Sequence, residues 1–438
     1  MPTLVIVGAQ WGDEAKGKMV DWLGSESHVV VRYSGGNNAG HTVIVGDQVY
    51  KFHLLPAGIL HPDCTAVLGS GMVICPRGLL EEYDRTAAIS QPLGTLKISS
   101  AAHVVFPYHR LLDQLEEEAR GANKIGTTSR GIGPAYQDKV ARIGIRMGEF
   151  VNPEHFRERL RDVMAVKNRL LGMFGSESLD FEEVYAEYSA YADRLRPFVC
   201  DTDWDLQEAV KRGDRILFEG AQGTFLDLDH GTYPYVTSSH PTSAGACLGT
   251  GIGPRDIQNV LGVCKAYATR VGSGPFPTEL DDATGEQIRA QGHEYGTTTG
   301  RGRRCGWLDL VALRQSCRLN SMSGLIVTRL DVLSGIGPLQ VATGYKLDGA
   351  DVPFLPADVA DLARVEAQLQ PMDGWDGDLQ SARKLEHLPE ATRRYLRFIE
   401  DFCETPIAVL SVGPDREQTI LLRPDLIWGP QPVAAAGV

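Results

Sequence analysis

Short runs of apolar, β-branched residues recur along the chain and predict buried strands. Each run is continuously apolar and bounded by turn-forming residues, which is typical of a parallel sheet covered on both faces. Helical patterns lie between several of the runs. We therefore expect an α/β fold with a large, mostly parallel central sheet flanked by helices. The predicted strands are residues 3–7, 28–31, 65–68, 216–218, 325–327 and 407–410.

The stretch from about residue 150 to 200 has a helical pattern instead. Asn152 followed by Pro153 indicates a helix start, because asparagine caps well and proline suits the first helical position. Two apolar stripes follow at helical spacing, and we interpret them as core-facing positions without chemistry. We expect a single domain, residues 1–438, with a helical insertion at about 150–200. The stripes are Phe156, Leu160, Val163, Leu170, Leu171 and Phe174, then Val184, Tyr188, Tyr191 and Leu195.

Composition and charge narrow the class of protein. The 438 residues are 43% hydrophobic and 23% charged, which is ordinary for a globular chain. A net charge of −13 argues against nucleic-acid binding. No apolar run approaches the ~20 residues of a membrane helix, and no basic leader is present. We expect a soluble, cytoplasmic protein with no membrane or nucleic-acid partner, whose eight cysteines are buried, reduced thiols outside any C-x-x-C pair.

A glycine-rich loop follows the first predicted strand and precedes a helical pattern. This is the context of a phosphate site, since glycines expose backbone N–H groups and the helix N-terminus adds positive charge. From Gly12 the spacing fits G-x-x-x-x-G-K, but Met19 replaces the Ser or Thr that would hold Mg²⁺ in a Walker loop. Asp13 lies inside the loop, where it needs a nearby cation or a proton to transfer. The loop reads Gly12-Asp13-Glu14-Ala15-Lys16-Gly17-Lys18.

A second glycine-rich string, Ser34-Gly35-Gly36-Asn37-Asn38-Ala39-Gly40-His41-Thr42, follows the next predicted strand. His41 in this string is better placed for polar chemistry than a histidine in the core. Basic residues also crowd two segments, 124–146 and 301–304. Local positive charge on an acidic protein suggests small anionic ligands such as phosphates and carboxylates.

Taken together, these strings resemble the adenylosuccinate synthetase family. The matches occur in order from residue 4 to about 415, so they cover nearly the whole chain. Any one string is weak evidence, but their joint occurrence is specific. The other matching strings are Gly126-Thr127-Thr128-Ser129-Arg130-Gly131-Ile132-Gly133-Pro134, Phe218-Glu219-Gly220-Ala221-Gln222-Gly223, Tyr235-Val236-Thr237-Ser238-Ser239, Thr297-Thr298-Thr299-Gly300-Arg301-Gly302-Arg303-Arg304, Thr328-Arg329-Leu330-Asp331 and Ser411-Val412-Gly413-Pro414.

The resemblance implies a P-loop-NTPase-like catalytic domain that spends GTP to join L-aspartate to inosine monophosphate (IMP). The γ-phosphate first moves to O6 of IMP, and the amine of aspartate then displaces it from C6. Asp13 is implied as the general base and His41 as the general acid, while Gln222 contacts the ring near O6. One Mg²⁺ per subunit is implied, with Asp13 and the Gly40 carbonyl as ligands. A homodimer is implied, in which Arg142 reaches the neighbouring subunit's IMP site.

The resemblance also assigns residues to each substrate. Asp331 suits guanine, because a carboxylate accepts from guanine N1–H and N2–H₂ together. The residues implied for GTP are Gly12, Asp13, Glu14, Ala15, Lys16, Gly17, Lys18, Gly40, His41, Thr42, Arg303, Arg329, Leu330, Asp331, Ser411, Val412 and Gly413. Those implied for IMP are Asp13, Glu14, Ala15, Lys16, Asn38, Ala39, Gly40, His41, Thr128, Arg142, Gln222, Thr237 and Arg301. Those implied for aspartate are Thr297, Thr298, Thr299, Gly300, Arg301, Gly302 and Arg303.

Two departures from the family pattern and two rival functions remain. Ala15 replaces a usual glycine and would be strained at a positive φ, whereas Arg329 replaces a commoner lysine with a similar apolar stem. One rival is a related ligase that takes dGMP instead of IMP, against which Asp13 argues. The other is a GTP-binding switch, which has no need of the 297–304 loop. An assay comparing IMP with dGMP, and aspartate-dependent GDP release, would separate the three.

Overall fold

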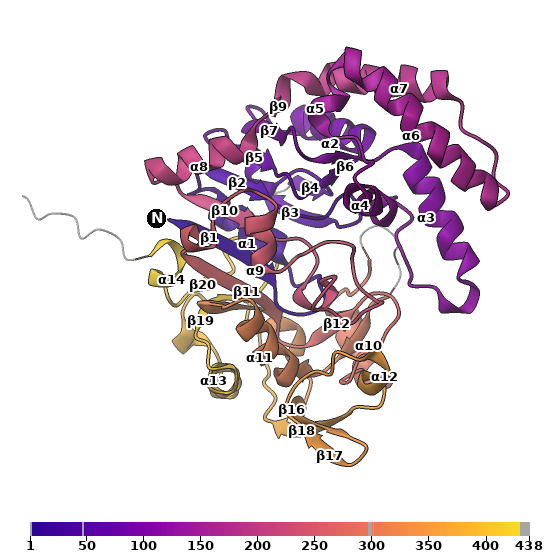
Figure 1. Cartoon of the computed structure of the whole chain (residues 1–438). Coiled ribbons are helices and arrows are strands. Elements are labelled where there is room, and N and C mark those ends of the chain that lie inside the picture. The colour runs from indigo at the N-terminus through magenta and orange to yellow at the C-terminus, as the bar shows by residue number, and fades with distance from the viewer. Residues whose placement is uncertain (1, 46–47, 297–299, 301, 430–438) are drawn as a thin grey trace, which may run out of the picture.

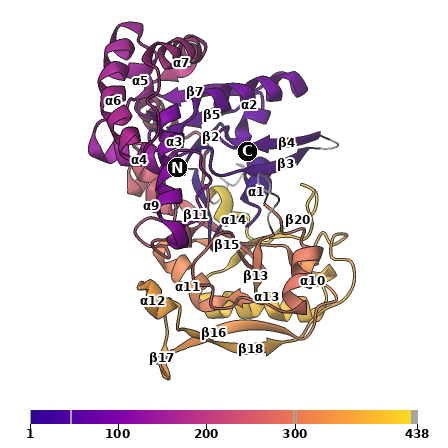
Figure 2. The same ribbon diagram turned by 90° about the vertical axis from the view of Figure 1, so that its right-hand side faces the viewer.

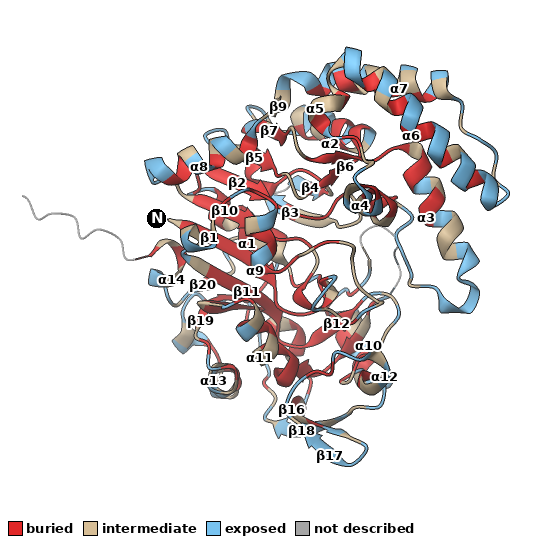
Figure 3. Ribbon diagram, in the orientation of Figure 1, coloured by how far each residue is buried: buried red, intermediate tan, exposed pale blue. Residues whose placement is uncertain are grey.

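The architecture is that of a computed structural model, which describes residues 2–45, 48–296, 300 and 302–429. Within those residues one sheet of ten strands crosses the molecule, and its inner strands are almost entirely buried (Figures 1 and 3). Across the sheet the strands are β20 (Thr419–Leu421), β19 (Ile407–Ser411), β15 (Gly324–Thr328), β11 (Asn259–Lys265), β1 (Thr3–Gly8), β10 (Ile216–Glu219), β2 (Val29–Arg32), β5 (Thr65–Leu68), β7 (Thr95–Ser99) and β9 (Val199–Cys200).

The predicted class is confirmed, since the neighbouring strands of this sheet pair in parallel except for β19 and β20. All six predicted strands are present, with ends within one residue of those expected. β1 lies between the two halves of the chain. Strands from residues 29–219 lie on one side of it and strands from 259–421 on the other. Figure 2 shows the same division, with the later residues gathered at one end of the molecule.

Helices cover both faces of the sheet. Helices α6 and α7 occupy the stretch that was expected to be a helical insertion, and the side chain of Asn152 caps α6 by accepting from Glu154 N–H. The expectation that Leu170 and Phe174 lie in the core is wrong, because both side chains are exposed at the C-terminal end of α6. The longer helices are α1 (Lys16–Gly24), α2 (Pro76–Ile89), α3 (Pro107–Ala119), α4 (Ile132–Ala141), α6 (Pro153–Met173), α7 (Phe181–Leu195), α8 (Thr202–Arg212), α10 (Ala283–Gln291), α11 (Leu310–Leu319) and α13 (Glu390–Cys403). The shorter ones are α5 (Met147–Phe150), α9 (Ser243–Leu248), α12 (Val359–Leu362) and α14 (Asp425–Trp428).

Smaller strand pairs carry the loops around the sheet. The hairpin of β3 (His41–Val45) and β4 (Gln48–Phe52) extends the second glycine-rich string. An outlying sheet combines β14 (Leu308–Asp309), β16 (Leu339–Leu347), β17 (Ala350–Val352) and β18 (Glu366–Met372). The remaining pairs are β6 (Val73–Ile74) with β8 (His103–Val104), and β12 (Ala268–Arg270) with β13 (Arg304–Gly306).

Two further expectations can be compared with the structure. All eight cysteines are free thiols; six are buried, while Cys200 and Cys247 are half-buried. Among the described residues, the helices lack the combination of length and apolar character that crossing a membrane requires.

Candidate active site

The phosphate loop runs from the carboxyl end of β1 to the first turn of α1. Its backbone turns sharply, with φ of 92° at Gly12, 61° at Asp13 and 69° at Ala15. It is also packed tightly against residues 222–223, because a Cβ added to Gly223 would lie 2.4 Å from the Gly12 nitrogen. The loop therefore has a strained, closely packed backbone, and strain of this kind tends to cluster at functional sites.

Two oppositely charged side chains hold the loop from inside. Glu14 is fully buried, and its Oε1 accepts from the N–H of Gln10 (3.1 Å) and of Gly12 (2.8 Å). The Lys16 ammonium donates to Glu14 Oε2 and to the Gln222 carbonyl, both at 2.5 Å. Lys16 thus links the predicted phosphate loop to the predicted purine-contacting residue. Its ammonium group therefore lies between residues that are predicted to contact the phosphates and a residue that is predicted to contact the purine.

Asp13 lies at the mouth of the loop and pairs with a residue from the last third of the chain. The Oδ2 atom of Asp13 is 2.7 Å from Nε of Arg303, and 35% of the Asp13 side chain is exposed, compared with 10% of Arg303. This contact joins the phosphate loop to the loop predicted to bind aspartate. The Asp13 carboxylate is thus both accessible and ionically paired with Arg303.

His41 lies over the start of α1. A Cβ added to Gly17 would come 2.8 Å from the Cδ2 of His41, so the glycine makes room for the ring. Nε2 of His41 is 3.7 Å from Oε1 of Glu219 and lacks a hydrogen-bond partner among the described residues. Burial, and then the positive charges of Arg32, His53 and Lys16, lower the pKa of His41 to about 3. The imidazole is therefore neutral here at physiological pH.

Behind His41, Glu219 is a buried acid at the carboxyl end of β10. Burial raises the pKa of Glu219 to about 7, although the Arg32 charge opposes this. Its Oε2 accepts from the Ala57 N–H at 2.9 Å, which fixes the carboxyl group beside the ring. The side of His41 that faces the protein interior is thus occupied by a group that titrates near neutral pH.

The predicted purine side gathers Gln222 and Asn38. Gln222 has a left-handed backbone (φ 50°), and its Nε2 donates to Asn38 Oδ1 at 3.4 Å. The Oε1 of Gln222 is buried without a partner in the described part of the chain. Buried polar atoms are usually paired, so an unpaired amide oxygen here is consistent with a place kept for a ligand. Thr237 is half-buried, and its hydroxyl meets that of Ser239 at 3.3 Å.

The predicted guanine side gathers residues that follow β15 and β19. Asp331 Oδ2 accepts from Gln380 Nε2 at 3.1 Å, while its Oδ1 is buried and unpaired among the described atoms. Lys18 donates to Ser411 Oγ and to the Gly413 carbonyl, both at 2.7 Å. Burial lowers the pKa of Lys18 to about 8, against the charge of Asp331. Lys18 therefore contacts the elements that are predicted to bind guanine, whereas Lys16 donates within the predicted phosphate loop.

Comparisons with known proteins show the family to which this chain belongs. A model of the adenylosuccinate synthetase family matches residues 5–420. The adenylosuccinate synthetase of Carboxydothermus hydrogenoformans is 52% identical over 423 residues, which is 96% of this chain and 99% of that protein. The chain belongs to the adenylosuccinate synthetase family. It is therefore a carbon–nitrogen ligase of purine biosynthesis that uses GTP to join L-aspartate to IMP.

Two solved structures have a fold similar to that of this chain. A fully ligated adenylosuccinate synthetase from Plasmodium falciparum is 37% identical and superposes with a TM-score of 0.91, covering 96% of this chain and 100% of that one. A cyanophage S-2L succinoaminodeoxyadenylate synthetase, bound to dGMP and dATP, is 22% identical with a TM-score of 0.60 over 96% of this chain and 95% of that one. The second likeness concerns the fold alone.

Not every residue that the family resemblance assigned is brought to the loop. Thr128 is exposed in the segment 121–131, whose backbone N–H groups at Ile125 and Gly126 are held by the Glu117 carboxylate. Arg142 is exposed at the end of α4 in a left-handed conformation, φ 63°. Thr297, Thr298, Thr299 and Arg301 lie outside the described residues.

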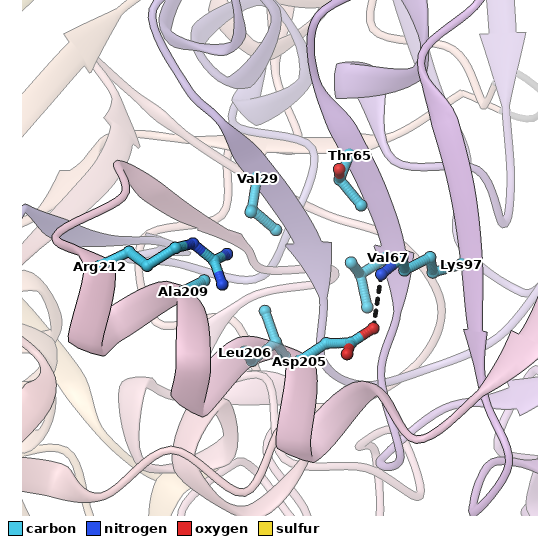
Figure 4. Close-up of a pocket in the computed structure, with 8 residues that line it drawn as sticks. All are labelled: Val29, Thr65, Val67, Lys97, Asp205, Leu206, Ala209 and Arg212. Atoms are coloured by element: carbon cyan, nitrogen blue, oxygen red, sulfur yellow. Dashed lines mark hydrogen bonds and ion pairs between the residues drawn. The ribbon is translucent and has the colours of Figure 1, made fainter.

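A separate pocket lies beneath α8. Val29, Val67, Leu206 and the Lys97–Asp205 ion pair (2.6 Å) line it, on the β2–β5–β7 side of the sheet (Figure 4). The residues described as lining it include none of those predicted for GTP, IMP or aspartate. We assign it no part in the family's reaction.

Three buried groups near the site were missed by sequence reasoning. Glu219 belongs to a matched string but was given no role, and Lys265 and Glu294 lie outside every matched string. The available signal for Lys265 is its position at the carboxyl end of β11, next to β1. To use that signal one must know that β11 lies next to β1, and the sequence pattern does not give the order of the strands in the sheet.

Proposed function

We propose that this chain, acting as one catalytic domain, ligates aspartate to IMP through a 6-phosphoryl-IMP intermediate, with Asp13 as general base and His41 as general acid. The observation that carries the proposal is the partly exposed Asp13 carboxylate at the mouth of a phosphate loop, paired with Arg303 at 2.7 Å. For O6 to attack phosphorus, the purine must lose its N1 proton. A carboxylate between the phosphates and the purine can accept that proton.

His41 is suited to meet the phosphates of GTP. Its ring covers the first turn of α1, where the helix N-terminus favours anions. The ring is neutral in this structure because burial and nearby cations lower its pKa. Phosphate oxygens beside the ring add negative charge that favours the imidazolium form. The acid is thus formed as the nucleotide binds, and it stabilises charge on the departing β-phosphate oxygen.

The donor set near the loop suits one Mg²⁺ per subunit. Carboxylate and carbonyl oxygens are the hard ligands that Mg²⁺ prefers, and Asp13 with the Gly40 carbonyl offers one of each. Gly40 directly precedes His41, whose ring lies against Gly17 in α1, and Asp13 belongs to the loop that leads into the same helix. When bound, Mg²⁺ would neutralise charge on the GTP phosphates.

Nucleotide selection rests on Asp331. Its Oδ1, which is buried and has no hydrogen-bond partner among the described residues, can accept from guanine, while adenine offers no matching pair of donors. Lys18 fixes the 411–413 segment beside it. We assign the IMP phosphate to Asn38, Thr128 and Thr237, the purine O6 to Gln222, and a carboxylate of aspartate to Arg303.

Two proposals concern the whole protein. The exposure of Arg142 supports a homodimer in which this side chain completes the IMP site of the neighbouring subunit. The eight free thiols support a reducing, cytoplasmic location.

The test is turnover by Asp13→Asn with IMP, GTP and L-aspartate, following GDP and adenylosuccinate together. We expect kcat to fall by about 10²–10⁴. Asp348→Asn is the matched control, because Asp348 is an exposed aspartate that also has a positive φ (51°), in the turn between β16 and β17. Retained turnover in Asp13→Asn would remove the proposed base. Turnover by the wild type with dGMP but not IMP would reject the substrate assignment.

A further inference from the structure

A buried acid, Glu294, lies behind the Asp13–Arg303 pair. Its side chain has no exposed surface. Its Oε1 accepts from the Lys265 ammonium at 2.7 Å and from the Tyr267 hydroxyl at 2.5 Å, and its Oε2 accepts from Nη1 of Arg303 at 2.7 Å. Lys265 donates in addition to the Thr269 hydroxyl at 2.7 Å. Every oxygen of this carboxylate is therefore satisfied, and Arg303 is one of its donors.

The backbone joins the same two residues. The Arg303 N–H donates to the Glu294 carbonyl at 2.8 Å, and Tyr295 bridges Gly302 in antiparallel fashion. Nε of Arg289 donates to the Arg303 carbonyl at 2.8 Å. Glu294 and Arg303 are thus joined by a main-chain hydrogen bond and by their side chains, at the two ends of the segment that connects them.

The two acids that share Arg303 are not equivalent. Burial alone would raise the pKa of Glu294, but the charges of Lys265 and Arg303 lower it to about 2, so the carboxylate stays ionised. Asp13 is one-third exposed, while Glu294 is enclosed. A contact at an exposed edge exchanges more easily than a buried, multiply bonded one. The Glu294 side of the guanidinium is therefore fixed, and the Asp13 side is free to change partner.

We propose that Glu294 is a positioning residue for the substrate aspartate: it holds Arg303 so that the opposite edge of the guanidinium receives a carboxylate of L-aspartate in exchange for Asp13. The inference rests on the proposed function, because it takes Arg303 as an aspartate ligand. Glu294 itself touches no substrate. Its effect should appear in aspartate binding and spare the two nucleotides.

The test is the steady-state kinetics of Glu294→Gln with each of the three substrates varied in turn. We expect the KM for aspartate to rise by about tenfold, the cost of one mispositioned charge-assisted hydrogen bond. The KM values for IMP and GTP should stay within about twofold, and kcat should fall less than the aspartate KM rises.

Asp309→Asn is the matched control. Asp309 is also a buried carboxylate, accepts a tyrosine hydroxyl (Tyr345, 2.5 Å), and lies at the start of α11 within another set of contacts. We expect it to leave all three KM values unchanged. Should Glu294→Gln fail to fold, Tyr267→Phe removes one donor and keeps the carboxylate, and the aspartate KM alone should again rise.

An unchanged aspartate KM in these variants, or an equal rise in all three KM values, overturns the inference while the wild type still turns over. A wild type that releases no GDP with IMP and aspartate instead overturns the proposed function, and with it the inference.

Discussion

Single residues shape the site through backbone conformations that most side chains avoid. Asp13, Ala15 and Gln222 all have positive φ, and all three belong to strings that the family resemblance singles out. Sequence reasoning raised the question of strain at Ala15, and the structure places it at φ 69°, where glycine is favoured. Positions of this kind can be predicted from the sequence, because the residue type that is usual at a position in the family indicates its backbone conformation.

Ala15→Gly should stabilise the fold by about 0.5–1 kcal/mol. Relief of a left-handed alanine gives about 1–2 kcal/mol, and the added freedom of glycine in the unfolded chain takes back about 0.4–1 kcal/mol. Urea unfolding measures the difference. Ala209→Gly in the middle of α8 should lose about 1 kcal/mol or more under the same conditions. A loss of stability in Ala15→Gly would mean that Ala15 is not strained.

Residues that act through burial could not be predicted. Asp13, His41 and Asp331 stand in recognisable strings, so the sequence alone names them. Glu294 is an ordinary glutamate in the sequence, and its importance comes from three donors that β11, the residues after it and the 303 region bring around it. Burial and pairing over long sequence separations are properties of the fold.

At the scale of elements, α1 packs two of its glycines against histidine rings. A Cβ on Gly17 would lie 2.8 Å from His41, and a Cβ on Gly24 would lie 3.1 Å from His61. The helix thus approaches two loops closely at its two ends. Only the first of these loops carries a proposed catalytic group.

Gly17→Ala should therefore lower kcat by tenfold or more while the protein stays folded, because the new methyl group displaces the His41 ring and small shifts of a catalytic group are costly. Gly24→Ala, in the same helix, should displace His61 and leave kcat within about twofold. Turnover assays with circular dichroism as a folding check compare the two. Equal kcat values for both variants would show that the position of His41 does not limit the reaction.

The sequence pattern predicted some of the strands and missed others. The six continuous apolar strands were found, whereas β11 was missed because Gly262 interrupts its apolar run and polar residues, Asn259 and Lys265, stand at its two ends. The glycine is there for packing, since a Cβ on Gly262 would come 2.2 Å from Sδ of Met322. β9 has only two residues, and in β7 the exposed and half-buried Thr95 and Lys97 interrupt the apolar positions. Edge strands and strands with packing glycines lack the pattern that identifies a buried strand.

At the scale of the whole molecule, the proposed dimer makes a quantitative prediction. If Arg142 completes the neighbour's site, an Arg142→Ala subunit and an Asp13→Asn subunit are each inactive alone for different reasons. Mixing them in equal amounts should restore about one quarter of wild-type activity, because half of the dimers are mixed and each holds one intact site. Activity is measured after subunit exchange over a range of protein concentration. No recovery in demonstrably mixed dimers would place Arg142 in its own subunit's site or outside the reaction.

The central position of β1 has a consequence for how the chain is made. β1 leaves the ribosome before the other strands of its sheet, yet its two neighbours, β10 and β11, begin only at Ile216 and Asn259. At about 5–20 residues per second, this strand, which is fully buried in the folded protein, waits on the order of 10 s or more for its first hydrogen-bonding partner. During synthesis this apolar segment must therefore be kept from other chains until residues 216 and beyond have been translated, and β1 is paired on both sides only after residue 259.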